Sequence, residues 1–313
     1  MSNAAMTVST ILNISRLVVG LILFIWFLTT IDLTETVSNF SLLPYWVIAL
    51  WTAVNLASRM LTNEAHLICI RFLKPTQNRM PLLMLGFIRS MGNYIAPLVG
   101  TSVYVAALKD RLLLPSEKVA PFMAMQSVVT LSSVSMIAIA GLFLHRQTNP
   151  LPWVILLLAF ASTSTVTWAI ANSRLGKTIS SNRNNKWIRS AFDGFSLAGC
   201  RPIKVIAIHL IQLAASVVRG SRMVLLFLAM GGLISIAEAL LLIALAEGSM
   251  LIQVTPGNIG VREGTLYLAG SALGMDPAIV ASVALSDRVI AVVFTGLMGA
   301  LSMIFLVHGK RYV

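Results

Sequence analysis

The stretch Gln253-Val-Thr-Pro-Gly-Asn-Ile-Gly-Val-Arg-Glu-Gly264 interrupts an otherwise apolar part of the chain. Proline has no amide hydrogen and clashes with the preceding helical turn, so Pro256 ends any regular helix there. The glycines that follow it allow backbone angles that other residues avoid. Arg262 and Glu263 come next, in nearly apolar surroundings. A broken backbone and ionisable side chains inside a membrane mark candidate functional positions.

The chain as a whole has the composition of a helical membrane protein. Of its 313 residues, 57% are hydrophobic and 11% are charged, whereas a soluble domain carries roughly 25% charged residues. Apolar runs near or above the bilayer-crossing length of about 18 residues recur along the chain. We therefore expect an all-α integral membrane protein, with residues 1–313 forming a single polytopic domain.

The net charge of +12 lies mostly between the apolar runs. This placement indicates an orientation signal and contact with anionic lipid headgroups rather than nucleic acid binding. About six spanning helices are expected, and a short loop carrying Asp32 and Glu35 should follow the first of them. The spans lie near residues 11–31, 42–72, 119–144, 153–172 and 203–230, and after Asp276-Pro277.

Two further apolar segments are interrupted. The first, Pro81–Leu108, breaks at Asn93–Gly100, and the second, near Ile234–Leu273, breaks at Thr255–Gly260. At about 1.5 Å of rise per residue, no piece of the first segment covers a hydrocarbon core of about 30 Å comfortably. We expect two re-entrant helical hairpins, although the first segment is also compatible with one long proline-kinked helix. The expected tips are at Pro97 and Gly100, and at Pro256, Gly257 and Gly260.

Charge bias predicts how these segments are oriented. The loop Ser173–Pro202 carries six Lys or Arg residues against the single acid Asp193, so we place it in the cytoplasm. If each hairpin enters and leaves on one side, both termini are also cytoplasmic. Residues 1–150 and 151–313 then form two inverted-topology repeats, and a substrate site is expected between the two broken elements.

Several polar residues are candidates for binding a phosphate-bearing substrate. Desolvating an arginine in a span requires a carboxylate, a phosphate or a water-filled cavity. Each candidate also has a structural alternative, such as snorkelling for Arg89, internal pairing with Glu238, Glu247 or Asp287 for the mid-span arginines, or helix capping for Glu263. The span near 42–72 adds a polar face with Asn55, Arg59, Asn63 and His66. The candidate substrate ligands are Arg89, Asn93, Arg219, Arg222, Arg262, Glu263 and Arg288.

Pro256-Gly-Asn-Ile-Gly-Val-Arg-Glu263 resembles the Pro-Gly-Gly-x-Gly-x-x-Glu signature of the lysylphosphatidylglycerol synthase transmembrane-region family. Ala284–Arg288 and Asn93–Gly100 are similar to two other regions of that family, and Asn258 departs from it by replacing the second glycine. No soluble aminoacyl-transferase segment follows within these residues. The resemblance therefore implies the lipid-translocating membrane module rather than lysyl-phosphatidylglycerol synthesis.

The expected function is flippase-like movement of an anionic or phosphate-bearing lipid across a bacterial inner (cytoplasmic) membrane. The alternatives are an ion or small-solute transporter and an intramembrane lipid-modifying enzyme. We expect no catalytic residues, no metal and no cofactor, because there is no metal-ligand cluster and no phosphate-cradling glycine loop. The expected partners are a membrane lipid substrate and anionic headgroups, and a homo-oligomer is compatible with the sequence.

Overall fold

A computed structural model describes residues 33–41, 43–73, 78–96, 99–110, 114, 116–145, 202–250 and 255–308, together with positions 18, 22, 25 and 29. Four expected features lie outside these residues, wholly or in large part. They are the first span near 11–31, the hairpin tip at Pro97, the span near 153–172 and the basic loop 173–202.

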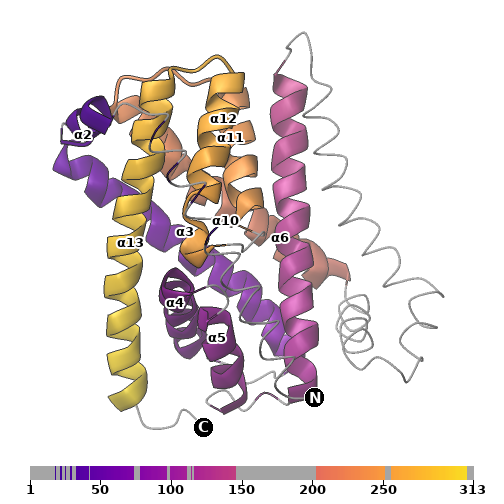
Figure 1. Cartoon of the computed structure of the whole chain (residues 1–313). Coiled ribbons are helices and arrows are strands. Elements are labelled where there is room, and N and C mark those ends of the chain that lie inside the picture. The colour runs from indigo at the N-terminus through magenta and orange to yellow at the C-terminus, as the bar shows by residue number, and fades with distance from the viewer. Residues whose placement is uncertain are drawn as a thin grey trace.

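All elements in the described ranges are helices (Figure 1), which confirms the all-α prediction. Three are long and apolar enough to cross a membrane, over Gln126–Leu144, Ile206–Ala229 and Pro277–Leu306. The protein is therefore a multi-pass membrane protein. The helices are α2 (Leu33–Ser41), α3 (Tyr45–Leu73), α4 (Arg79–Ile95), α5 (Val99–Asp110), α6 (Ser116–Leu144), α10 (Pro202–Ala229), α11 (Ile236–Ser249), the short 3₁₀ helix η1 (Pro256–Asn258), α12 (Val261–Ala272) and α13 (Pro277–His308).

The prediction of a short loop carrying Asp32 and Glu35 is wrong in part, because Leu33–Ser41 forms the short helix α2. This helix packs against α13. Its Asn39 side chain donates a hydrogen bond of 3.2 Å to the Ser282 hydroxyl, and Phe40 packs against the main hydrophobic core. Tertiary contacts with a distant helix therefore stabilise an element that its own short, polar sequence did not predict.

One face of α13 consists of large apolar side chains that no described residue covers. Val289, Val293, Leu297, Leu301 and Phe305 are 48%, 57%, 62%, 48% and 59% exposed, and they recur every four residues. Residues four apart lie on the same side of a helix. A stripe of this kind is unfavourable in water and well suited to acyl chains, so this face of α13 points toward lipid.

The two interrupted segments form two pairs of packed helices, α4 with α5 and α11 with α12. Figure 1 shows the first pair at one end of the bundle and the second at the other. The alternative prediction of one long proline-kinked helix over Pro81–Leu108 is wrong. A Cβ added to Gly100 would lie 1.8 Å from the Arg89 carbonyl oxygen, whereas eleven residues of continuous helix separate two residues by about 16 Å. The chain turns back on itself, and only glycine fits at this contact.

The breaks in the two pairs meet. Gly257 has a φ of 57°, and a Cβ there would lie 2.3 Å from Cδ1 of Tyr94. The guanidinium carbon of Arg288 lies 5.7 Å from the centre of the Tyr94 ring, and its Nη1 donates to the Gly257 carbonyl oxygen at 2.7 Å. The end of α4 is thus docked onto η1, with α13 alongside both.

Candidate functional site

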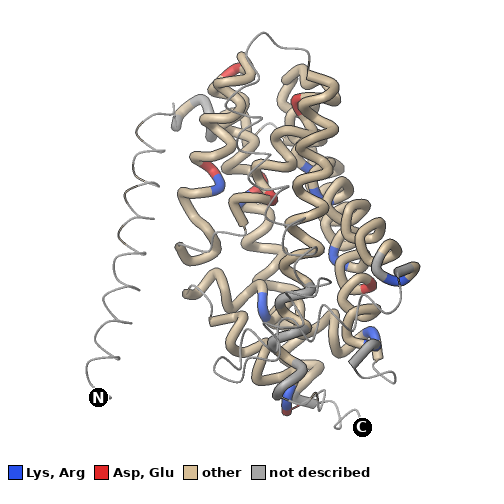
Figure 2. Tube along the Cα trace, turned by 90° about the vertical axis from the view of Figure 1, so that its right-hand side faces the viewer, with Lys and Arg blue, Asp and Glu red and all other residues tan. Residues whose placement is uncertain are grey.

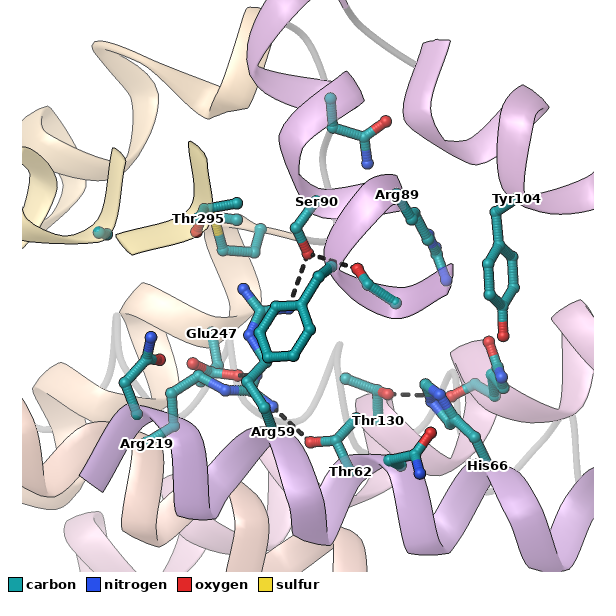
Figure 3. Close-up of a pocket in the computed structure, with 18 of the residues that line it drawn as sticks. Arg59, Thr62, His66, Arg89, Ser90, Tyr104, Thr130, Arg219, Glu247 and Thr295 are labelled. Carbon is teal, nitrogen blue, oxygen red and sulfur yellow. Dashed lines mark hydrogen bonds and ion pairs between the residues drawn. The ribbon is translucent and has the colours of Figure 1, made fainter. Parts of the chain in front are cut away.

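A cavity of about 300 Å³ lies where the two broken segments meet. Helices α3, α4, α6, α10 and α13 all contribute to its lining, and Figure 3 shows many of these side chains pointing inward. The lining is rich in arginine, amide and hydroxyl side chains, although it belongs to a predominantly apolar chain. Its polar members include Asn55, Arg59, Thr62, Asn63, His66, Arg89, Ser90, Asn93, Tyr94, Tyr104, Gln126, Thr130, Gln212, Arg219, Arg222, Glu247, Arg262, Arg288 and Thr295.

The polar face predicted for α3 forms one wall. Its members recur every three or four residues, so they share one side of the helix. Arg59 belongs to this face, and its Nη1 donates to the Ser90 hydroxyl of α4 at 2.7 Å. The Nε of Arg59 is buried and has no hydrogen-bond partner in the described part of the chain. Arg59 therefore reaches the cavity with donor capacity left over.

Arg89 of α4 faces the same cavity instead of snorkelling to an interface (Figure 3). Its guanidinium carbon lies 5.2 Å from the centre of the Tyr104 ring of α5, a cation–π contact that holds the side chain without neutralising it. Among the described residues, neither Arg59 nor Arg89 forms an ion pair. These two guanidiniums remain available for an anionic ligand.

Asn93 has a structural role in this geometry. Its side-chain oxygen accepts a hydrogen bond of 3.1 Å from the backbone amide of Thr101, near the start of α5. The first turn of a helix leaves amide groups without helical partners, so Asn93 satisfies one of them from the facing helix. The residue links α4 to α5, and its predicted contact with substrate stays a prediction.

The mid-span arginines of α10 have carboxylate partners. Arg219 forms an ion pair with Glu247 of α11, and its Nη2 also donates to the Thr62 hydroxyl of α3 at 2.8 Å. Arg222 donates from Nη1 to Asn55 Oδ1 at 2.6 Å. These bonds tie α10 to α3 and α11 through groups that face the cavity.

Asp287 of α13 is the centre of a buried network. Its side chain is fully buried and lies 2.9 Å from Arg222 Nε and 2.6 Å from Arg262 Nη1. The indole Nε1 of Trp51 donates to the same carboxylate at 2.9 Å. A buried carboxylate is stable only when it is paired and hydrogen-bonded, and three helices supply its partners. The internal salt bridge predicted for Asp287 is confirmed.

Glu263 and Arg288 form a second buried ion pair, with 2.6 Å between Oε1 and Nε. The other Glu263 oxygen accepts a hydrogen bond from the Gly260 amide at 2.8 Å, which caps the start of α12. Arg288 in turn donates to the carbonyl oxygens of Gly257 and Asn258. Of the two interpretations of Glu263, the geometry is that of a helix cap, and Arg288 serves as a clamp on the broken backbone.

The charges of this site do not balance. Six arginines line the cavity, and the described carboxylates paired with them are Glu247, Glu263 and Asp287. The described site therefore has a formal charge of +3. Figure 2 shows Lys, Arg, Asp and Glu positions inside the bundle as well as at its ends, among helices that are mostly uncharged.

The structure brings all the candidate arginines to one region and divides them by role. Arg219, Arg222, Arg262 and Arg288 have internal carboxylate partners, whereas Arg89 has none among the described residues. The sequence patterns did not select Arg59 as a substrate ligand or identify Tyr94, Tyr104, Gln126 and Thr130 at all. The last two are four residues apart in an apolar span, a helical spacing that could have identified them.

A comparison with known protein families identifies the family of this chain. Residues 13–299 match the family described as "Lysylphosphatidylglycerol synthase TM region". No curated protein and no solved structure gives a significant match. The match includes both broken segments, the Asp287 network and every arginine that lines the cavity. The chain therefore belongs to the lysylphosphatidylglycerol synthase transmembrane-region family.

Proposed function

We propose that the protein moves a phosphate-bearing lipid between the leaflets of the membrane, with the headgroup held in the cavity where the two broken segments meet. Family membership supports a lipid-related function in general. The observation that carries the specific proposal is the formal charge of +3 on the described residues of an intramembrane cavity. Buried charge without a counter-charge is strongly unfavourable, so the site requires an anion.

Arg59 and Arg89 are the proposed phosphate ligands. The planar guanidinium matches the spacing of phosphate oxygens and binds them with charge-assisted hydrogen bonds. Neither side chain has an ion-pair partner among the described residues. The internally paired arginines then hold the cavity walls in place and contribute positive potential. This assignment keeps Arg89 from the predicted ligands and adds Arg59, and it gives supporting roles to Arg219, Arg222, Arg262 and Arg288.

The size of the cavity supports a headgroup as the ligand. About 300 Å³ is at the small end of ligand pockets, which enclose about 300–1,000 Å³. A headgroup fits this volume and a whole diacyl lipid does not. The acyl chains would stay in the bilayer, against lipid-facing surfaces such as the apolar stripe of α13, while the headgroup crosses through the protein.

The same proposal includes a topology. We infer two inverted repeats, about six spanning helices and two re-entrant hairpins that enter a bacterial inner membrane from opposite sides, with both termini cytoplasmic. Its support is that α4–α5 and α11–α12 lie at opposite ends of the bundle and that their breaks meet at Tyr94 and Gly257. Two broken elements that meet near the midplane are the arrangement in which many transporters place their substrate site.

Leaflet exchange of labelled lipids in vesicles that contain the purified protein tests the function. We expect anionic phospholipids to exchange faster than in protein-free vesicles, and mass spectrometry of the recovered lipid should show an unchanged mass. A changed lipid mass would favour the alternative of an intramembrane enzyme. Ion flux without lipid exchange would favour the alternative of an ion transporter.

A further inference from the structure

One end of the cavity is lined mainly by uncharged polar side chains, and Arg89 stacks on the Tyr104 ring beside them. In Figure 3, His66, Tyr104 and Thr130 lie on the side of the cavity away from Arg219 and Glu247. Asn63 is three residues from His66 on α3, and Gln126 is four residues from Thr130 on α6, so helical spacing places these two amides at the same end. We call this set, Asn63, His66, Tyr104, Gln126 and Thr130, the neutral end.

The neutral end contains an unused hydrogen-bond donor. Gln126 is 6% exposed, and its side-chain Nε2, although the residue neighbours Tyr104, makes no hydrogen bond of normal geometry in the described part of the chain. Buried amide groups are almost always hydrogen-bonded, so an exception requires an explanation. A ligand with hydroxyl oxygens in the cavity would supply the missing acceptor.

The lining is unsuited to an amine. Glu247 is the acid among the described lining residues, and it is already paired with Arg219. An ammonium group needs a carboxylate or several free acceptors, and here it would meet a site with an excess of guanidiniums. Hydroxyl groups carry no charge and can both donate and accept, so they suit amide, imidazole and hydroxyl side chains.

We infer that the substrate is a phosphodiester lipid whose headgroup carries hydroxyls and no amine, as glycerol and sugar headgroups do. The phosphate binds Arg59 and Arg89, and the headgroup hydroxyls bind the neutral end, including Gln126. This inference rests on the proposed lipid function. It adds which class of headgroup the same cavity selects.

Binding to the purified full-length protein in detergent tests the inference. Short-chain phosphatidylglycerol is compared with phosphatidylpropanol, which has the same charge and the same number of headgroup carbons but no hydroxyls, and with phosphatidylethanolamine. Each neutral hydrogen bond contributes roughly 1 kcal/mol, so losing two hydroxyls should weaken binding by about tenfold or more. Phosphatidylethanolamine should bind more weakly than phosphatidylglycerol. Equal affinities for phosphatidylglycerol and phosphatidylpropanol would overturn the inference, as would a preference for the amine.

Variants and a soluble competitor locate the effect. Gln126→Leu should reduce the preference for phosphatidylglycerol over phosphatidylpropanol several-fold. The matched control is Ser133→Ala on the same helix, because that buried hydroxyl donates to the Val129 carbonyl at 2.9 Å and does not line the cavity. A preference that survives Gln126→Leu unchanged would contradict the assigned contact.

Failure of the inference and failure of the proposed function are distinguishable. Binding of both anionic lipids without headgroup preference contradicts the inference alone. Binding of neither anionic lipid contradicts both. Glycerol 3-phosphate that displaces the lipid at equal affinity would assign the site to a soluble phosphate ester, and the inference would then be wrong about a lipid.

Discussion

At the scale of single residues, the carboxylate of Asp287 neutralises part of the positive charge of the buried arginines. It is fully buried and pairs with both Arg222 and Arg262. Asp287→Asn should therefore leave two guanidiniums without their carboxylate. Breaking a buried ion pair by removing one partner costs about 3–5 kcal/mol, which we expect to appear as a large drop in Tm of the detergent-solubilised protein.

The matched control for this prediction is Glu64→Gln. Glu64 pairs with Arg79 at 3.2 Å, and that arginine side chain is 68% exposed. Exposed ion pairs contribute about 0–1 kcal/mol, so Tm should change little. Equal effects of the two substitutions would show that Asp287 does not neutralise a buried network.

The sequence predicted the chemistry of these residues better than their pairing. It indicated Asp287 as an internal salt-bridge partner of a mid-span arginine, and the pair with Arg222 confirms this expectation. It did not predict the hydrogen bond from Trp51, which is 236 positions away along the chain. Pairings of this kind depend on how the helices pack, and one sequence contains no record of that packing.

At the scale of elements, the docking of α4 onto η1 depends on Gly257. Gly257→Ala should destabilise the protein for two reasons, since its φ of 57° disfavours any side chain and the new Cβ would lie 2.3 Å from the Tyr94 ring. Gly274→Ala is the control, because that glycine has a similar φ of 75° and nothing within 4 Å of the added Cβ.

Thermal unfolding of the two glycine variants separates the two effects. Backbone strain costs roughly 1–2 kcal/mol at either position, and only Gly257→Ala adds the clash. We expect a clearly larger loss of Tm at Gly257 than at Gly274. Equal losses would mean that Tyr94 does not pack closely against the broken segment.

Both breaks were predictable from sequence because proline and glycine act locally on the backbone. Helix lengths followed from the apolar runs, and α3, α6, α10 and α13 begin and end near the predicted positions. Helix α2 was missed because its contacts with α13 stabilise a segment whose own sequence is short and polar. The contact between Tyr94 and Gly257 also could not be predicted from patterns within either segment.

At the scale of the whole molecule, the proposal requires the two hairpins to enter from opposite sides. In a background without Cys69 and Cys200, Met80→Cys at the start of α4 should react with a membrane-impermeant thiol reagent from the cytoplasm. Leu233→Cys, just before α11, should react from the other side. Both wild-type side chains are exposed, at 59% and 92%. Labelling of both positions from one side would contradict the inverted repeats.

The central claim is that uncompensated arginines in the cavity bind the phosphate of a translocated lipid. The most direct test is the rate of leaflet exchange of phosphatidylglycerol by Arg59→Gln and Arg89→Gln, with Arg79→Gln as the exposed, surface-paired control. The account predicts that each cavity variant loses at least about tenfold in rate, while the control exchanges lipid like the wild type. Wild-type exchange by both cavity variants, with folding intact, would contradict it.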